Sequence, residues 1–344
     1  MKLALDIGYS GARVDIPMEK ILLAERLGFD SVWSAEAYGS DAFSPLAYIA
    51  ALTKRIRLGT GIAQLAGRTP TMAAMTAQTI DALAGEGRMI VGLGVSNPQV
   101  VEGWYGQPWG KPGERLRDYV AIMRKVWARE APLTHSGTQL SVPYAGADAT
   151  GLGKPLKSIL HGNPHIPIYL GTSTPANLRL TGEIADGLVT MHVTPGTLPR
   201  KLAPLREGIA RRTDGKTLAD FEIVSNLRIV ITDDVRGAMA ASRAFTALYV
   251  GGMGAKEQNF HKAAMIERGY GEAAERIQEL YLAGHKQEAE AAVPDEYLDE
   301  AALYGPRERI KERFPIWADA GFTILRLTNM DDEALKLAAD LFAG

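Results

Sequence analysis

Short apolar runs and stretches of helical periodicity alternate along almost the whole chain. The helical stretches repeat apolar residues at helical spacing, as in segments 17–27, 72–83 and 116–127, and Pro175 at a first turn predicts a further helix to Ile184. The apolar runs have the length of buried strands and lie at residues 2–7, 30–35, 56–61, 89–94, 166–170, 186–191, 222–232 and 322–327. Strict alternation of strands with helices predicts a parallel sheet.

Eight such units in 344 residues favour an α/β fold in which the sheet closes into a (β/α)8 TIM barrel. The alternative is a doubly wound open sheet, but neither GTG at 59–61 nor GLG at 92–94 continues to the third glycine of the dinucleotide fingerprint. Two segments interrupt the rhythm, at about 130–165 and 251–300, and we interpret both as insertions in a single barrel domain spanning 1–344. The first predicts a hairpin around Gly137, whereas the second is charged and helical.

Composition narrows the possible partners. The net charge of -2 gives no overall field that attracts nucleic acid or an anionic membrane. The first apolar run is too short for a signal segment or a membrane span. With no cysteine, disulfides and thiolate metal sites are excluded, and a cytoplasmic protein is favoured. We therefore expect a cytoplasmic protein that acts on a small-molecule substrate, without a nucleic-acid or membrane partner.

A metal site is not expected. His161 and His165 stand four residues apart, a spacing that suits ligands on a helix. Gly162 and Pro164 between them argue against a helix, and no carboxylate accompanies the two imidazoles.

Three of the apolar runs end in glycine together with serine or threonine. These ends are GTG at 59–61, GLGVSNP at 92–98 and GTSTP at 171–175. The carboxyl ends of successive parallel strands meet on one face of a barrel, so the three segments predict one shared site. Glycines allow close approach, and free N–H groups and hydroxyls suit a flat ring and a phosphate.

The residues around these ends resemble a known family. The stretches EAYGSDAFSPLAYIAALTKRIRLGTGIAQLAGRTPTMAAM and DALAGEGRMIVGLGVSNPQVVEGWYG are similar to the bacterial luciferase-like superfamily. More narrowly they resemble its branch that uses the deazaflavin coenzyme F420, with methylene-tetrahydromethanopterin reductase and the F420-dependent alcohol and glucose-6-phosphate dehydrogenases. GLGKPLK, ALYVGGMGAKEQNFH and PDEYLDE extend the likeness through most of the chain.

The resemblance implies an oxidoreductase that moves a hydride between carbon 5 of F420 and an alcohol, ketone or activated alkene. It implies a non-prolyl cis peptide between Gly61 and Ile62, behind the cofactor ring. It also implies a homodimer through early barrel helices, although the methionines of the helix at 72–83 could instead face the core. The residues expected at the cofactor are Asp6, Thr60, Gly61, Ile62, Gly94, Val95, Ser96, Asn97, Gly171, Thr172 and Ser173.

The sequence departs from the family at one position that matters for chemistry. Several members carry an acidic residue and then a histidine after the second strand, whereas this chain has Glu36, Ala37 and Tyr38. Proton transfer would then fall to Glu36, to Tyr38 or to His192. The alternatives are an ion pair between Glu36 and Arg68, packing of Tyr38 against the ring, and structural roles for His192 and His261.

Two other functions stay open. The first is an FMN-dependent monooxygenase of the same superfamily, which would use reduced flavin and oxygen. The second is a non-catalytic flavin-binding or deazaflavin-binding protein, which the missing histidine motivates. The aromatic residues Trp104, Tyr105 and Trp109 either line a substrate mouth or belong to a loop folded onto the barrel.

Overall fold

The computed structural model describes residues 1–253, 259–328 and 331–343. Part of the motif GGMGAKEQNFH, residues 254–258, therefore lies outside the described residues. The chain divides into two compact units, each described here by itself. Unit 1 comprises residues 1–191, 200–225 and 323–326, and unit 2 comprises residues 192–199, 226–322 and 327–344. The assignment of the whole chain to a single domain stays a prediction.

Unit 1 holds a closed parallel barrel of eight strands, so the TIM-barrel prediction is confirmed and the open sheet is wrong. The circle closes where Ile223 lies opposite Leu188. In barrel order the strands are β1 (Lys2–Gly8), β2 (Ser31–Ser34), β3 (Arg57–Thr60), β5 (Met89–Gly94), β8 (Ile168–Gly171), β9 (Gly187–Val189), the start of β10 (Glu222–Ile231) and β12 (Ile324–Thr328). All eight lie where the apolar runs predicted them.

The barrel interior is filled by large side chains from several strands. Trp33 is fully buried, and its ring lies 6.0 Å from that of Tyr169. Gly59 on the neighbouring strand makes room for the indole, because a Cβ there would come within 2.5 Å of the Trp33 ring. The strands read as apolar runs because parallel strands are covered on both faces.

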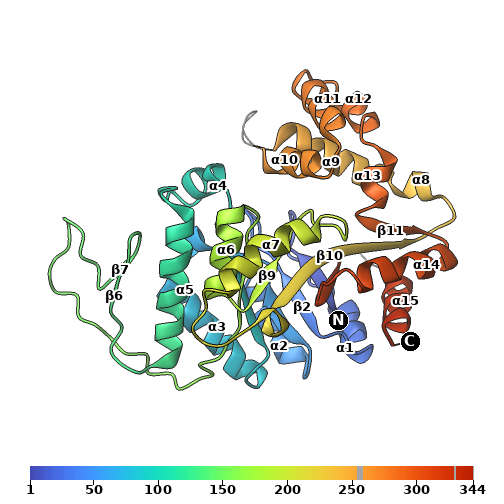
Figure 1. Cartoon of the computed structure of the whole chain (residues 1–344). Helices are drawn as coiled ribbons and strands as arrows, with labels where there is room; N and C mark the ends of the chain where they lie inside the picture. Colours follow the sequence, from blue (N-terminus) through green and yellow to red (C-terminus); the bar gives the residue numbers. More distant parts are fainter. Residues whose placement is uncertain (254–258, 329–330, 344) are drawn as a thin grey trace. The chain divides into compact units, whose positions relative to one another are not determined.

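The helices of unit 1 follow the strands (Figure 1). Two of them begin with a proline behind a capping threonine. Thr69 accepts a hydrogen bond from the Met72 N–H at the start of α3, and Thr174 does the same for Asn177 at the start of α6. Their bounds are α1 (Met18–Arg26), α2 (Ser44–Leu52), α3 (Pro70–Ala84), α4 (Pro98–Gly103), α5 (Pro112–Ala128), α6 (Pro175–Ile184) and α7 (Leu198–Ile209), the last starting in unit 2.

Short elements complete unit 1. The hairpin predicted around Gly137 is confirmed as β6 (His135–Ser136) paired with β7 (Ser141–Val142). A further short strand, β4 (Ala63–Gln64), pairs with the end of β5. Two 3-10 turns are η1 (Leu65–Gly67) and η2 (Leu218–Asp220).

The methionines of α3 do not face the core, which was one of the two roles expected of them. The core interpretation of the methionines is wrong, because Met72 and Met75 are 52% and 54% exposed. The buried face carries small residues instead, Ala73, Ala74 and Ala77 among them. Alanine fits there because α3 lies against α2, α5 and β5, where close approach leaves no room for long side chains.

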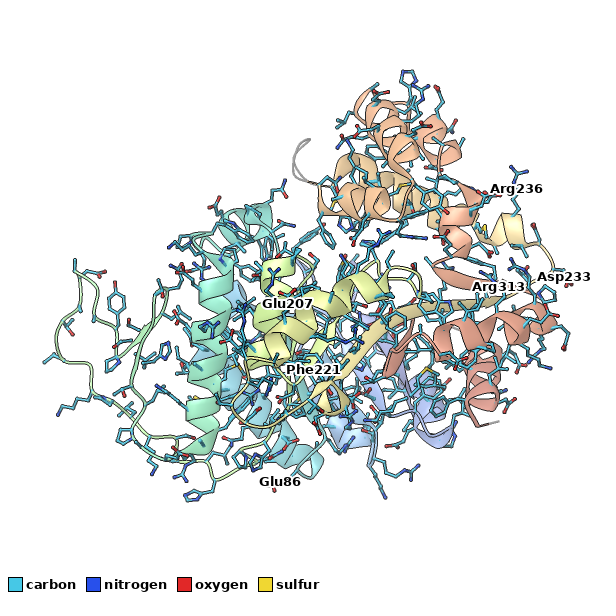
Figure 2. All side chains as sticks on the ribbon, in the orientation of Figure 1. Glu86, Glu207, Phe221, Asp233, Arg236 and Arg313 are labelled. Carbon is cyan, nitrogen blue, oxygen red and sulfur yellow. The ribbon has the colours of Figure 1, made fainter. Side chains whose placement is uncertain are left out.

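Unit 2 is largely helical. Figure 1 shows α9 (Ala240–Gly252), α10 (Phe260–Glu267), α11 (Gly271–Leu282) and α12 (Lys286–Ala291) grouped together, around a core that includes Met265 and Ile277. Arg313, labelled in Figure 2, lies on α14. Its Nη1 donates a hydrogen bond to Oδ1 of Asp299 on α13. The remaining helices are α8 (Val235–Ala238), α13 (Asp295–Asp299), α14 (Arg307–Ala318) and α15 (Asp332–Ala343).

One strand of unit 2 was not predicted. Residues 228–231 of β10 pair with β11 (Ala302–Gly305), beyond the part of β10 that closes the barrel. No helix within 1–253, 259–328 and 331–343 combines the length and apolarity needed to cross a membrane.

Candidate functional site

The carboxyl ends of the barrel strands bring most of the predicted cofactor residues together in unit 1. Ser34 lies opposite Thr60 where β2 meets β3. Gly94 lies opposite Gly171 where β5 meets β8. The loop residues expected at the cofactor follow these ends directly and are Val95, Ser96, Asn97, Thr172 and Ser173.

Ile62 packs between glycines from two neighbouring strands. A Cβ on Gly94 would lie 2.7 Å from Cδ1 of Ile62, and a Cβ on Gly171 would lie 2.9 Å from its Cγ2. The predicted cis peptide between Gly61 and Ile62 is present. The two glycines are therefore needed so that the Ile62 side chain can lie across the ends of β5 and β8. We name Ile62, Gly94 and Gly171 the glycine cradle.

Arg326 on β12 lies beside this loop and was not predicted. Its Nη1 donates to the Gly61 carbonyl at 3.1 Å and lies 3.6 Å from Oδ1 of Asp6. Its guanidinium also faces the Trp33 ring, 5.8 Å from the centroid. Burial raises the pKa of Asp6, although the charge of Arg326 and the N–H of Gly8 partly offset that effect. The signal in the sequence was one arginine inside the otherwise apolar strand ILRLT.

Three buried polar atoms, on β1, on β2 and on the short strand β4, have no hydrogen-bond partner among the described residues. They are Oδ1 of Asp6, Oγ of Ser34 and Oε1 of Gln64. The orientation of the Gln64 amide is fixed, because its Nε2 donates to the carbonyl of Glu36 and so Oε1 must be the other atom. A buried polar group without a partner costs about 1–3 kcal/mol. A flat ring whose edge carries both N–H and C=O groups, as in deazaflavins and flavins, fits such donors and acceptors.

Glu36 is held in an ion pair, as the alternative interpretation anticipated. Its Oε1 accepts from Nη1 of Arg68 at 2.7 Å, and its Oε2 accepts from the backbone N–H of Gln64 at 2.8 Å. Nη2 of Arg68 binds Asp41 at 2.9 Å. Burial raises the pKa of Asp41, but hydrogen bonds from Ser44 and Phe43 and the charge of Arg68 lower it further than that, to below its ordinary value. The Glu36 carboxylate therefore ties the loop after β2 to the loop after β3.

The aromatic segment after α4 folds onto these same loops. The ring of Tyr38 lies 6.4 Å from that of Trp104, and both side chains are exposed. Tyr105 packs against Gly67, and its hydroxyl lies 3.5 Å from the Ala37 carbonyl. Trp109 borders a small hollow together with Leu65, Ala66, Val95, Val101, Pro112 and Arg115. The segment is folded onto the barrel loops and also lines a hollow, so a loop packed on the barrel and a substrate mouth both stay possible interpretations.

His192 belongs to unit 2 and is paired with another histidine there. It follows β9 by three residues, and its Nε2 lies 2.7 Å from Nδ1 of His261. Burial, the neighbouring imidazole and the charge of Arg268 lower the pKa of His192 to about 3. Burial lowers the pKa of His261 to about 4. Both rings are therefore neutral at pH 7.

No metal cluster forms within the described part of the chain. Nδ1 of His161, one of the two histidines considered as metal ligands, lies 3.1 Å from Nη1 of Arg129 and is therefore engaged in a contact with that arginine.

Comparison with known proteins agrees with this geometry. Residues 6–323 match the family of luciferase-like monooxygenases. A Mycobacterium tuberculosis protein, provisionally named coenzyme F420-dependent oxidoreductase, is 44% identical over 343 residues, covering 99% of each chain. The coenzyme F420 dependent tetrahydromethanopterin reductase from Methanopyrus kandleri has a similar structure, with a TM-score of 0.77 at 20% identity over 98% of this chain and 97% of that one. An F420-dependent secondary alcohol dehydrogenase in complex with an F420-acetone adduct gives a TM-score of 0.74 at 18% identity, over 99% of this chain and 97% of that one.

The closed barrel and its glycine-rich strand ends define a TIM-barrel enzyme. The chain belongs to the luciferase-like monooxygenase family, in the branch of its F420-dependent oxidoreductases.

Proposed function

We propose that the protein transfers a hydride between carbon 5 of coenzyme F420 and a small organic substrate, an alcohol/ketone pair or an activated alkene. The cofactor supplies the hydride chemistry, while the protein orients it, excludes water and handles the proton. The cysteine-free sequence favours action in the cytoplasm.

The observation that carries this proposal is the glycine cradle beside buried polar atoms that lack a hydrogen-bond partner among the described residues. Ile62 on Gly94 and Gly171 offers an apolar floor, and Asp6, Ser34 and Gln64 offer hydrogen-bonding atoms next to it. The 44% identity to a relative with an F420-dependent name supports the deazaflavin over FMN. We propose that the floor supports the ring and that the loops at 94–97 and 171–173 hold the ring edge and phosphate.

The three residues expected to move the proton differ in their surroundings. The Glu36 carboxylate is occupied by Arg68 and Gln64, which favours a positioning role over proton transfer. Tyr38 is exposed beside Trp104, which favours a contact with the ring or the substrate. His192 is neutral and follows the carboxyl end of a barrel strand, the usual place for catalytic groups in this fold. We propose His192 as the proton donor and acceptor.

We also propose that two chains associate through α2 and α3. Tyr48 and Leu52 on α2 and Met72 and Met75 on α3 are large apolar side chains exposed on two helices that pack together. An apolar face of this kind marks an interaction surface.

Turnover assays test the reaction. Oxidised F420 with propan-2-ol or cyclohexanol, and reduced F420 with acetone, cyclohexanone or cyclohex-2-enone, report hydride transfer through the cofactor absorbance. Reduced FMN with the same compounds, followed by oxygen uptake, tests the monooxygenase alternative. Turnover with F420 and no oxygen uptake is expected. Oxygen-dependent turnover with FMN alone would contradict the proposal, and tight F420 binding without any turnover would favour the non-catalytic alternative.

A further inference from the structure

The side-chain amide of Gln64 in unit 1 is buried and fixed in orientation. Gln64 is 5% exposed and lies on β4, where it is the register partner of Gly94 on β5. Its Nε2 donates to the backbone carbonyl of Glu36 at 3.0 Å, so the second terminal atom, Oε1, can only accept. Turning the amide over would place two oxygens against each other and lose this hydrogen bond. Gln64 therefore presents an acceptor and not a donor.

Glu36 holds Gln64 at a second point. Its Oε2 accepts from the backbone N–H of Gln64 at 2.8 Å, while its Oε1 accepts from Nη1 of Arg68. Nη2 of Arg68 binds Asp41, which keeps the guanidinium in place. The Glu36 side chain is only 4% exposed, so water competes little for these contacts. The direction of the Gln64 amide thus depends on a buried ion pair as well as on its own side chain.

The donor for this acceptor does not come from the described part of the chain. Oε1 of Gln64 is buried and has no hydrogen-bond partner among the described residues. Buried polar atoms are almost always paired, because an unpaired one costs free energy. An acceptor that is both fixed and unpaired marks the place where a donor group of a bound molecule completes the hydrogen bond.

The glycine cradle lies next to this acceptor. Ile62, two residues before Gln64, packs on Gly94 and Gly171, and Gly94 is also the residue opposite Gln64 in the sheet. An apolar surface with one acceptor beside it suits a flat ring that carries an N–H in its edge. The oxidised deazaflavin ring has a single ring N–H, at N3 between two carbonyls. An acceptor that cannot become a donor therefore selects N3 over the carbonyls beside it.

On the basis of the function proposed above, we propose that Gln64 orients the cofactor by accepting a hydrogen bond from N3–H of the deazaflavin ring. The pyrimidine edge of the ring then lies towards β4. N3–H is present in the oxidised and in the reduced ring, so the contact stabilises both forms equally. Its loss raises the KM for F420 and leaves kcat unchanged, as expected for an interaction that contributes uniform binding.

The first test compares Gln64→Met with a matched control, Gln78→Met. Gln78 is also a buried glutamine of unit 1, 1% exposed, and its Nε2 donates to the carbonyl of Asn163, but it lies on α3 and not at a strand end. Both changes replace an amide by an apolar side chain of similar length. We expect Gln64→Met to weaken the binding of oxidised and of reduced F420 alike, by about tenfold or more. Gln78→Met should leave both affinities within about twofold. Fluorescence titration measures the oxidised form and equilibrium dialysis the reduced form, after circular dichroism has shown that both variants are folded.

The second test changes the ligand, so it does not depend on a variant that folds. The probes are the 8-hydroxy-5-deazaflavin head group of F420 and its N3-methyl derivative, which has no N–H at that position. The unaltered protein and Gln78→Met should bind the N3-methyl compound at least about tenfold more weakly than the parent. Gln64→Ala removes the acceptor and makes room for the methyl group, so its affinities for the two compounds should agree within about threefold.

Equal affinity of the unaltered protein for the two compounds would overturn the role of Gln64 and leave the proposed function standing. Unchanged F420 affinity in Gln64→Met would overturn it in the same way. Binding of FMN in place of F420, with N3-methyl FMN rejected by the unaltered protein and accepted by Gln64→Ala, would overturn the proposed function while the role of Gln64 in orienting the ring stands. Absence of binding of either cofactor would overturn both.

Discussion

Oε1 of Glu36 lies 2.7 Å from Nη1 of Arg68, and the Glu36 side chain is only 4% exposed. Removing the arginine would leave a buried carboxylate with one backbone partner. We expect Arg68→Met to lower the free energy of unfolding by about 3 kcal/mol, at the lower end for buried pairs because Arg68 keeps some solvent contact. Urea denaturation measures the change.

The matched control for this prediction is Arg117→Met. Arg117 is likewise paired with a glutamate, since its Nη1 and Nη2 both donate to Glu183. Half of the Arg117 side chain is exposed, however. Its loss should cost less than about 1 kcal/mol. Equal effects of the two variants would show that burial of Glu36 is not what makes its pairing matter.

The glycine cradle predicts a binding defect that a second change repairs. Gly94→Ala brings a methyl group against Ile62 and displaces its side chain. We expect F420 affinity to fall about tenfold or more, equivalent to about 1.4 kcal/mol, measured by fluorescence titration. Combining Gly94→Ala with Ile62→Ala removes the overlap and should recover affinity relative to Gly94→Ala alone.

Gly103→Ala serves as the control for the cradle, because a Cβ at that position meets nothing within 4 Å. Its affinity for F420 should match that of the unaltered protein. Full affinity in Gly94→Ala would mean that the position of Ile62 does not matter for the ring.

The exposed methionines of α3 predict the oligomeric state. Met72→Lys with Met75→Lys places two charges on the proposed contact surface. We expect the dimer to dissociate at least about 100-fold more readily, as measured by sedimentation velocity. Leu152→Lys with Leu156→Lys, two exposed leucines of the insertion, should leave the dimer intact. A protein that is monomeric before any change would contradict the dimer directly.

The histidine pair predicts how stability changes with pH. The pKa values of His192 and His261, about 3 and about 4, lie below the ordinary 6.5. Between the lowered pKa values of the folded protein and the ordinary pKa of 6.5, the unfolded chain binds more protons than the folded one. The contribution to stability is therefore complete above about pH 6.5 and declines as the pH falls towards 4. The double variant His192→Gln, His261→Gln should lose less stability than the unaltered protein between about pH 7 and 4.5. Parallel curves would show that the pair is not buried as a neutral unit.

Most of the barrel follows from sequence because strand and helix signals are local. Each of the eight apolar runs became a barrel strand. The strand β11 was not predicted. Its only sign in the sequence was that the apolar run of β10 is longer than the part of β10 that closes the barrel. The methionine face of α3 was misassigned because periodicity cannot distinguish an apolar stripe facing the core from one facing outwards.

The site was predictable only where the backbone determines it. The glycine ends and the Gly61–Ile62 cis peptide follow from short motifs. Arg326 on the last barrel strand contacts Asp6 and Gly61, which lie far from it in sequence. No local sequence pattern predicts such a contact. The same holds for His192 with His261, which are 69 residues apart in sequence. Pairings of this kind depend on the closed fold.

The central claim is tested most directly by titrating the purified protein with oxidised F420 and with FMN side by side, following fluorescence. We expect F420 to bind in the micromolar range or tighter, about −8 kcal/mol, and FMN to bind at least about 100-fold more weakly. Tight binding of FMN with weak or no binding of F420 would contradict the account and direct the work to oxygen-dependent chemistry.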